Sequence, residues 1–330
     1  MLKNIEIIDY KCFKKFKLDG LSQINIISGG NNVGKTALLE ALFIEKKVFV
    51  FEDFDMSIFT SPLITIANNR DINDNNLLTY LKTINISLKS NNKTININYK
   101  SEYRLNEEEQ QKTTELNEDY DHYLVAYIND SLTLLPINSL NLKEQSQSYI
   151  NSSKPNNSEL VKLYSNIQTK GIQHKFLEYL KILDKNFAWL EPQLINNELL
   201  LRINLNNPEQ SLISSELGEG VNRYMEILSV LLVNSKDSVF IDEIENGIHY
   251  SKLKDIWKAK IEIVQKEKIQ LFVTTHDKES IEALIEASEE SKYKDISSIQ
   301  LYKDEKNIIS PIVLQYKDFA YGINRGADVR

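Results

Sequence analysis

The sequence predicts a mixed α/β protein built around a predominantly parallel sheet. Three short apolar runs, residues 23–28, 239–241 and 269–274, have the length and composition of buried strands. Apolar residues at helical spacing follow the first and the third run, which is the order of elements in a parallel sheet with helical connections. Two alternating segments, residues 83–100 and 188–205, predict antiparallel hairpins, so the fold combines both kinds of pairing. The first is expected to turn at Asn91 and Asn92, and the second at Asn196 and Asn197.

Further elements are indicated along the chain by their periodicity. Runs that read as strands occur at residues 2–10, 14–20, 122–128 and 131–137. Two helices are expected at residues 158–168 and 172–183, the first with Ser158 as its N-cap. Residues 141–158 are polar and rich in Ser and Asn, which indicates a surface loop. We expect a single domain over residues 1–330, with a small helical lobe inserted at about residues 141–186.

Composition excludes several classes of protein. With 39 basic and 47 acidic residues, the net charge is −8, so the whole surface does not attract nucleic acid or anionic membrane. The single cysteine, Cys12, excludes an internal disulfide and a zinc cluster of several thiolates, and we expect it to pack in the core. No run of 18 apolar residues occurs and the N-terminus alternates like a strand, so we expect a cytoplasmic protein without a membrane partner.

The segment "SGGNNVGKTALLEAL", residues 28–42, carries the most specific motif. Gly29, Gly34, Lys35 and Thr36 fit the pattern G-x4-G-K-[ST], in which backbone N–H groups surround phosphate oxygens. A glycine-rich turn that binds nothing is the simpler interpretation of the motif taken alone. Its position between a predicted strand and a predicted helix favours a nucleoside triphosphate site.

In that interpretation the loop N–H groups and the helix N-terminus hold the β-phosphate, and Lys35 reaches the β- and γ-phosphates. Thr36 binds Mg²⁺. The residues expected to bind ATP are Gly29, Gly30, Asn31, Asn32, Val33, Gly34, Lys35, Thr36 and Ala37.

Polar side chains follow the other two apolar runs. Asp242 is expected to bind Mg²⁺ together with Thr36, and Glu243 to act as the general base that orients the attacking water. His276 can donate a hydrogen bond to the γ-phosphate and sense its loss. An exposed acidic strand end and an incidental histidine are the alternatives. Because the carboxyl ends of parallel strands meet at one edge of a sheet, we expect all these residues at adjacent strand ends.

A glycine-flanked helix start lies in the segment "SSELGEGVNRYMEILSVLL", residues 214–232. Free N–H groups there can bind an anion, although many helices begin after glycine for no functional reason. Since one nucleotide site is complete without this segment, it can serve the nucleotide of a second molecule. The residues concerned are Leu217, Gly218, Glu219 and Gly220.

In this order the motifs resemble those of the ABC-type ATPases, and most closely the soluble branch related to chromosome-maintenance and overcoming-lysogenization-defect (OLD) proteins. The resemblance covers "GGNNVGKT", "LGEG", "VFIDE", "ENGIH" (residues 245–249) and "TTH". It implies a P-loop ABC-ATPase head with a parallel core sheet, an antiparallel β subdomain and a small helical lobe. Two heads would dimerise head to tail around two ATP molecules with Mg²⁺, using Lys35, Glu243 and His276 for hydrolysis.

The resemblance also implies that "LGEG" of one head faces the γ-phosphate held by the other, with "ENGIH" at the same seam. The family usually has Ser at the position of Gly218, so a hydroxyl contact is missing and hydrolysis is expected to be slow. Candidates for the family's glutamine loop are Gln145, Gln147 and Gln168, and an adenine-stacking aromatic is expected around Phe13. A coiled-coil arm and a Toprim nuclease domain are not expected.

Two functions from different classes remain open. The first is an ATP-hydrolysing dimer, or a larger oligomer, that switches a separately encoded nuclease or toxin in anti-phage defence. The second is a DNA-binding repair or recombination factor, with lysine-rich faces at residues 45–49 or 252–260. A transporter subunit is disfavoured by the "IDEIENGIH" and "GEG" variants. In the dimer, Gly220→Arg is expected to block hydrolysis and leave nucleotide binding to the isolated head nearly intact.

Overall fold

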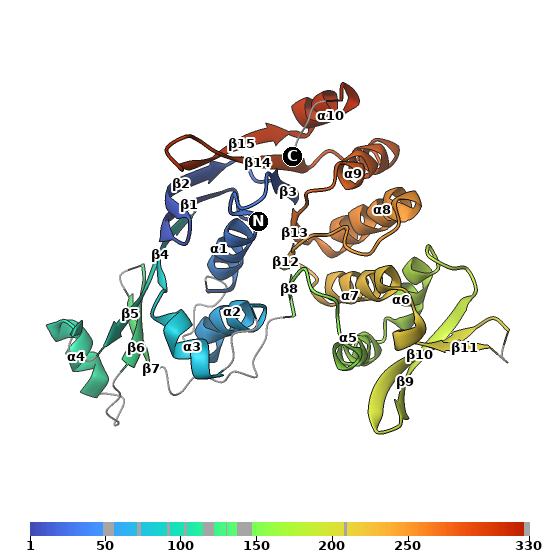
Figure 1. The fold of residues 1–330 in the computed structure, drawn as a ribbon, viewed down its shortest axis with the longest axis horizontal. Coiled ribbons are helices and arrows are strands. Elements are labelled where there is room, and N and C mark those ends of the chain that lie inside the picture. Colours follow the sequence, from blue (N-terminus) through green and yellow to red (C-terminus); the bar gives the residue numbers. More distant parts are fainter. Residues whose placement is uncertain are drawn as a thin grey trace. The chain divides into compact units, whose positions relative to one another are not determined.

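The computed structural model describes residues 1–48, 56–70, 74–90, 93–101, 104–114, 122–129, 131–136, 147–207 and 210–326. The chain divides into two compact units (Figure 1). The first comprises Met1–Leu21, Gly29–Tyr149 and Gln300–Val313, and the second comprises Ser22–Ser28, Ile150–Ile299 and Leu314–Arg330. Each unit combines distant parts of the sequence, and the single domain expected over residues 1–330 remains a prediction.

An antiparallel sheet forms much of the first unit. Its order is β2-β1-β4-β5-β6-β7, with β1 (Asn4–Tyr10), β2 (Phe13–Asp19), β4 (Asn85–Ser90), β5 (Lys93–Ser101), β6 (His122–Ile128) and β7 (Ser131–Pro136). Ile5 and Ile7 are buried whereas Glu6 and Ile8 are partly exposed, because successive strand residues point to opposite faces. The antiparallel portion predicted from the alternating runs is confirmed. The turn predicted at residues 91 and 92 lies outside the described residues.

The described part of this unit also contains α1 (Lys35–Val48), α2 (Met56–Asn68), α3 (Asp74–Leu81) and α4 (Glu107–Thr114). Helix α1 packs against α2 and β1. Its side chains Leu38, Leu39, Leu42 and Phe43 are fully buried, as their helical spacing predicts. Since burying one such side chain contributes about 1.5–3 kcal/mol, α1 is held firmly in the core of its unit.

The predicted parallel core consists of three neighbouring strands. β3 (Ile24–Gly29), β13 (Gln270–Thr274) and β12 (Ser238–Ile241) pair in this order and run parallel. The sheet has the order β15-β14-β3-β13-β12-β8, with β8 (Tyr149–Ile150), β14 (Ile296–Lys303) and β15 (Ile309–Gln315). Ile241 pairs with Val273, and Thr274 with Ile27, so the carboxyl ends of the three strands share one edge.

Helices α7 (Glu219–Val233), α8 (Tyr250–Glu267) and α9 (Lys278–Glu290) lie side by side in the second unit (Figure 1). The helices predicted near residues 158–183 are present as α5 (Asn157–Thr169) and α6 (Gln173–Leu180), which pack against α7, whereas α10 (Tyr316–Asn324) packs against α9. Among the described helices, none is long and apolar enough to cross a membrane.

A three-stranded antiparallel sheet completes the described part of the second unit. It contains β9 (Phe187–Ile195), β10 (Glu198–Leu205) and β11 (Ser211–Ile213). The predicted turn of the β9–β10 hairpin is confirmed, because Asn196 and Asn197 have φ of 51° and 64°. A two-residue hairpin turn of this kind needs positive φ at both central positions, which Asn tolerates.

Asn156, and not Ser158, is the N-cap of α5. The Asn156 side chain accepts a hydrogen bond from the Glu159 N–H at 2.9 Å, and the Glu159 carboxylate accepts one from the Asn156 N–H at 2.9 Å. This reciprocal capping box satisfies two backbone donors. Ser158 lies inside the first turn and donates its hydroxyl to the Asn156 side chain at 2.7 Å.

The loop predicted at residues 141–158 is also partly wrong. Residues 141–146 lie outside the described residues, but β8 follows them, with Tyr149 and Ile150 buried. The Asp242 N–H donates to the Ile150 carbonyl at 2.8 Å, which places β8 beside the end of β12. A two-residue strand is too short to show a period in the sequence.

Candidate active site

The phosphate loop joins β3 to α1 along a path that only glycine can follow at two positions. Gly29 and Gly34 have φ of +135° and +93°. A Cβ atom at Gly29 would lie 2.4 Å from the Leu301 carbonyl oxygen, and one at Gly34 would lie 2.6 Å from Cys12 Sγ. The glycines of the motif are therefore required by backbone conformation and by close neighbours.

The loop and the start of α1 present hydrogen-bond donors that fit a phosphate. Lys35 Nζ donates to the Gly29 carbonyl at 2.9 Å and to the Gly30 carbonyl at 2.8 Å, which holds the ammonium over the loop. The first turn of α1 contains no acidic side chain, and its N-terminal N–H groups carry partial positive charge. Val33 and Ala37 are buried, so they can contribute to such a site only through their backbone.

Glu40 anchors the phosphate-loop helix to other segments of the first unit. Its buried carboxylate accepts hydrogen bonds from Arg70 at 2.8 and 3.1 Å, from the Tyr10 hydroxyl at 3.3 Å and from Lys11. Because charge-assisted bonds are among the strongest, this cluster fixes α1 to the β1–β2 turn and to the segment after α2. Sequence analysis missed it because the partners are far apart in the chain.

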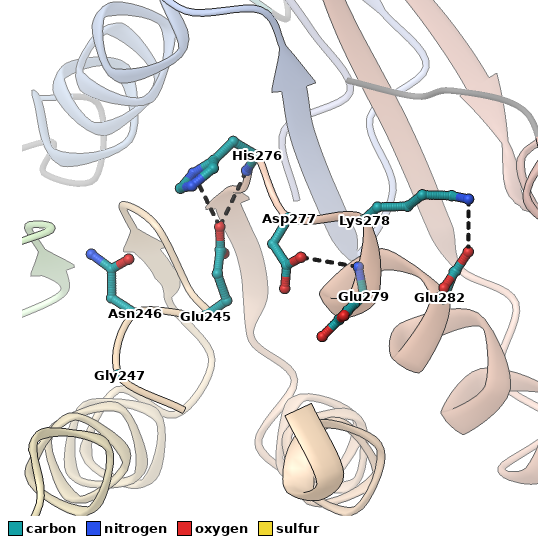
Figure 2. A pocket seen from close by; sticks show the side chains of 8 residues that line it. All are labelled: Glu245, Asn246, Gly247, His276, Asp277, Lys278, Glu279 and Glu282. Carbon is teal, nitrogen blue, oxygen red and sulfur yellow. Dashed lines mark hydrogen bonds and ion pairs between the residues drawn. The ribbon is translucent and has the colours of Figure 1, made fainter. Parts of the chain in front are cut away.

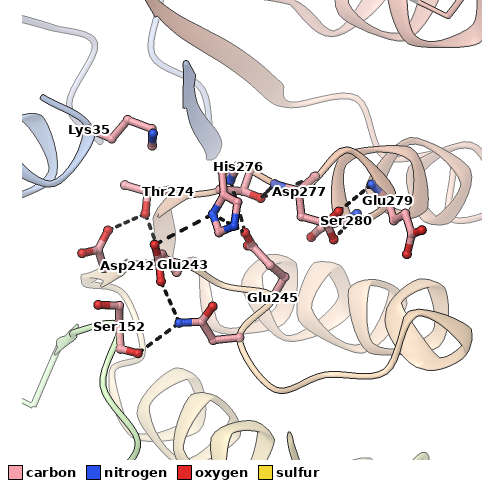
Figure 3. Close-up of polar contacts among 12 residues, drawn as sticks. Lys35, Ser152, Asp242, Glu243, Glu245, Thr274, His276, Asp277, Glu279 and Ser280 are labelled. Atoms are coloured by element: carbon pink, nitrogen blue, oxygen red, sulfur yellow. Dashed lines mark hydrogen bonds and ion pairs between the residues drawn. The ribbon is translucent and has the colours of Figure 1, made fainter. Parts of the chain in front are cut away.

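Asp242 and Glu243 follow β12 in the second unit, and Thr274 at the end of β13 contacts both (Figure 3). The Thr274 hydroxyl donates to the buried Asp242 carboxylate and accepts a hydrogen bond from the Glu243 N–H at 2.8 Å. Glu243 has φ of 50°, a conformation that costs about 1 kcal/mol or more in a non-glycine residue. Surrounding contacts must therefore hold Glu243 in place.

His276 lies beside Glu243 and Glu245 (Figures 2 and 3). Its Nδ1 atom is 3.3 Å from Glu245 Oε1 and 3.8 Å from Glu243 Oε1, and its backbone N–H donates to Glu245 Oε1 at 3.2 Å. The imidazole is 54% exposed, so it is accessible to a substrate. The structure thus brings together Asp242, Glu243 and His276 at the neighbouring ends of β12 and β13.

An open pocket of about 680 Å³ adjoins this group (Figure 2). Its lining residues come from the 245–247 loop and from the start of α9: Glu245, Asn246, Gly247, His276, Asp277, Lys278, Glu279 and Glu282. Asp277 caps α9 by accepting from the Glu279 and Ser280 N–H groups at 3.1 Å. The exposed face of His276 opens into this pocket.

The "LGEG" segment begins α7, and its two glycines differ in their surroundings. Gly218 is the N-cap residue, is exposed, and has no heavy atom within 4 Å of a Cβ built on it. A Cβ at Gly220 would lie 2.0 Å from the Gly247 carbonyl oxygen of the same chain. The expectation that Gly220→Arg leaves the isolated head intact is therefore wrong, because the substitution collides with the backbone of the 245–247 loop.

Charged side chains are buried beneath the acidic pair. Arg223 donates from Nη2 to the Asp242 carbonyl at 2.7 Å and from Nη1 to the Glu226 carboxylate at 2.9 Å. Burial raises the pKa of Glu226 to about 7, against the opposing effect of Arg223. Burial lowers the pKa of Lys260 to about 7; Arg223 lowers it further and Glu245 opposes the shift.

Lys260→Met is expected to raise the free energy of unfolding at neutral pH. The folded pKa of Lys260 lies below that of an unfolded lysine, so wild-type stability rises with pH between about 7 and 10. The uncharged Met avoids the cost of burying a charge. The gain in the free energy of unfolding over the wild type is therefore largest below pH 7. Denaturant titrations at about pH 6.5 and about pH 9.5 should show the advantage shrink by roughly 3 kcal/mol.

Lys266→Met is the matched control for this experiment, because Lys266 lies on the same helix and is exposed. Its effect on the free energy of unfolding should be small and should be the same at both pH values. A pH-independent advantage of Lys260→Met would show that Lys260 keeps an ordinary pKa in the folded protein.

Two further expectations from the sequence are wrong. Cys12 is exposed in the turn between β1 and β2, with its thiol against the phosphate loop, and does not pack in the core. Phe13 is buried and its ring packs 4.6 Å from that of Phe16, so it is not available to stack on adenine. Of the glutamine-loop candidates, Gln145 lies outside the described residues and Gln168 lies on α5.

The fold is that of a P-loop ATPase head. A solved structure described as an SMC head bound to the C-terminal winged-helix domain of ScpA is similar over 96% of this chain and 99% of that chain. The TM-score is 0.51 and the sequence identity is 11%. A relative from Helicobacter pylori described as "ATP/GTP phosphatase" is 24% identical over 94% of this chain and 95% of that protein.

Residues 24–282 match the family described as "AAA domain, putative AbiEii toxin, Type IV TA system". The chain belongs to this family, and it is an ATPase. The matched range begins with β3 and ends within α9, so it includes the phosphate loop, the "LGEG" segment and the acidic pair.

Proposed function

We propose that the protein is an ATP-binding and hydrolysing switch that works as a head-to-tail dimer and controls a separately encoded effector. The observation that carries the dimer is the start of α7, where Gly218 is exposed and makes no side-chain cap. Uncapped N–H groups at a helix N-terminus are suited to an anion, such as the γ-phosphate held by a second copy. A head whose own phosphate loop already holds a nucleotide has a use for these donors only in trans.

The proposal gives each residue of the site one role. Lys35 and the phosphate loop bind the triphosphate, Glu243 accepts the proton of the attacking water, and His276 donates a hydrogen bond to the γ-phosphate. Thr36 and Asp242 are proposed to hold Mg²⁺, on the strength of the sequence pattern. The ion, when bound, neutralises charge on the phosphates. The close contact of Glu243 with His276 supports their assignment to one reaction.

A role in anti-phage defence, in the OLD-like branch of these ATPases, is the further part of the proposal, and the family description supports only its link to a toxin. That description names a putative toxin and a type IV TA system, and a toxin is one kind of component that the switch is proposed to control. An ATPase whose dimer forms and separates with its nucleotide can release or restrain such a component. Purification of the native complex followed by mass spectrometry tests this part of the proposal.

The DNA-binding alternative loses one of its two lysine-rich faces in the structure. On α8, Lys260 is buried, Lys254 lies 3.2 Å from the Glu290 carboxylate, and Lys258 pairs with the same carboxylate. Neutralised or buried lysines release few counterions from DNA, so these contacts weigh against residues 252–260 as a DNA-binding face.

Gly218→Arg is expected to abolish ATP hydrolysis and leave the affinity of the isolated chain for ATP unchanged. Gly218 has φ of −59°, which any residue adopts, and the space around it is open, so the variant should fold. The arginine would occupy the place where a second head must approach. Phosphate release, nucleotide affinity and ATP-dependent crosslinking should be measured on the same preparation.

Ser215→Arg is the matched control, since Ser215 is exposed three residues before Gly218 and the same charge is added. It should hydrolyse ATP at a rate close to that of the wild type. Normal hydrolysis by Gly218→Arg would mean that each head works alone, and the dimer switch would have to be abandoned for a monomeric ATPase.

A further inference from the structure

The loop of residues 245–247 contacts both groups to which hydrolysis is assigned. Glu245 contacts His276 (Figures 2 and 3). Asn246 contacts Glu243. The third residue, Gly247, packs against Gly220 at the start of α7. All these residues belong to the second unit.

Glu245 has the geometry of a group that orients an imidazole. Its side chain is only 9% exposed, and one oxygen, Oε1, accepts from the His276 backbone N–H at 3.2 Å and lies 3.3 Å from the His276 Nδ1. An ionised carboxylate can only accept hydrogen bonds, so beside ionised Glu245 the Nδ1 atom carries the proton. In the neutral ring Nε2 is then the free acceptor, and in the charged ring it is the second donor.

Other charged groups face Glu245 from the helices that pack around it. Lys260 on α8 interacts electrostatically with Glu245, and Arg223 on α7 interacts with Lys260. Burial raises the pKa of Glu245, whereas hydrogen bonds from Thr275 and His276 oppose the shift. These surroundings hold the carboxylate in place while leaving its Oε1 atom directed at His276.

Asn246 holds Glu243 in a comparable way. Its side-chain amide donates to Glu243 Oε2 at 2.8 Å and to the Ser152 carbonyl at 3.0 Å. Both amide hydrogens are thus used, and they join the segment after β8 to the carboxylate. Glu243 has an unfavourable positive φ; the Thr274 hydroxyl holds its backbone N–H, and the Asn246 amide holds its carboxylate.

We propose that Glu245 and Asn246 are positioning residues for ATP hydrolysis. Glu245 fixes the tautomer and orientation of His276, and Asn246 fixes the carboxylate of Glu243. The inference rests on the proposed function, in which His276 and Glu243 take part in hydrolysis. Because Gly247 contacts Gly220, the same loop connects the start of α7 to both groups, so displacement of α7 is transmitted to the reacting residues.

The tautomer of His276 tests the first half directly and needs no nucleotide. The chain has four histidines, so ¹⁵N labelling of histidine gives few signals, and His276→Asn assigns the relevant one. In the wild type at about pH 8 the neutral ring should be the Nδ1–H tautomer. Glu245→Ala should shift it to Nε2–H, whereas Glu245→Gln, whose amide oxygen still accepts, should keep Nδ1–H.

A wild-type His276 found as the Nε2–H tautomer would overturn the assignment, because a protonated Glu245 donating to Nδ1 would give that result. An unchanged tautomer in a folded Glu245→Ala protein would overturn it as well. Either result stands whether or not the protein hydrolyses ATP. If the wild-type protein showed the expected tautomer but no ATPase activity, the proposed function would be contradicted and the orientation of His276 by Glu245 would still hold.

Steady-state kinetics test the second half. Asn246→Ala and Glu245→Ala should each lower kcat by on the order of 10²-fold, the cost of misplacing a reacting group by about 1 Å, with little change in KM for ATP. Glu245→Gln should recover most of the loss. Glu282→Gln, which changes a carboxylate in the same pocket without contacting His276, is the control. If Asn246→Ala kept the wild-type kcat, whether or not its KM for ATP rose, Asn246 would not position Glu243.

Discussion

Glu243→Gln should lower the turnover of ATP by on the order of 10²–10⁴-fold while ATP remains bound. The amide has nearly the shape of the carboxylate and can still meet the Asn246 amide through its oxygen. It cannot accept a proton from water, so the chemical step is lost and the binding contacts are kept. Phosphate release at saturating ATP, together with the nucleotide content of the purified protein, measures both parts of the prediction.

The same variant should enrich the two-headed state with ATP more than with ADP. ATP and ADP differ only in the γ-phosphate, which the second head is proposed to contact. A ligand shifts the equilibrium between single and paired heads only by its difference in affinity for these two states. Chemical crosslinking with each nucleotide measures the shift, and Glu282→Gln serves as the charge-matched control. If Glu243→Gln turned over ATP at the wild-type rate, Glu243 would not be the base and the role would have to pass to another group.

Lys35→Ala should weaken ATP binding by on the order of 10–100-fold, because a hydrogen bond to a charged group is worth about 1.5–3 kcal/mol. The lysine also donates to the Gly29 and Gly30 carbonyls, so its removal loosens the loop itself. Titration calorimetry with ATP and with ADP gives the two affinities. The loss should be smaller for ADP, which lacks the γ-phosphate.

Lys46→Ala, at the other end of α1, removes the same charge from the same helix and should bind ATP normally. Unaltered affinity of Lys35→Ala would contradict the assignment of the loop as a triphosphate site. If Lys35→Ala lowered the melting temperature and Lys46→Ala did not, the difference would reflect the lost contacts to the Gly29 and Gly30 carbonyls. The comparison of ATP with ADP would then decide whether Lys35 binds the γ-phosphate.

The elements that sequence could predict are those with a local signal. Three features each depend on residues close together in the chain: the phosphate loop between strand and helix, the apolar strands that end before Asp242 and at Thr274, and the turn at Asn196 and Asn197. Parallel pairing of β3, β13 and β12 followed from their apolar character and from the helical segments between them.

The elements that sequence could not predict depend on distant partners. Strand β8 has two residues and forms because the Asp242 N–H needs an acceptor at Ile150. The contact of Gly220 with Gly247, and the pairing of Asn246 with Glu243, leave no periodicity and no motif that would mark them. The N-cap of α5 was predictable, since Asn156 and Glu159 stand at capping-box spacing.

The pairing of β3 with β13 has a consequence for how the protein is made. Every residue of β3 is buried, yet its partner β13 lies near the other end of the sequence. At an elongation rate of roughly 5–20 residues per second, the ribosome delivers β13 on the order of tens of seconds after β3. During synthesis the strands of the antiparallel sheet, β1, β2 and β4 to β7, can pair with one another, while β3 stays an apolar strand without its parallel neighbour. We therefore expect residues 24–29 to stay exposed on the nascent chain until its last third has emerged, which makes them a site for chaperone binding.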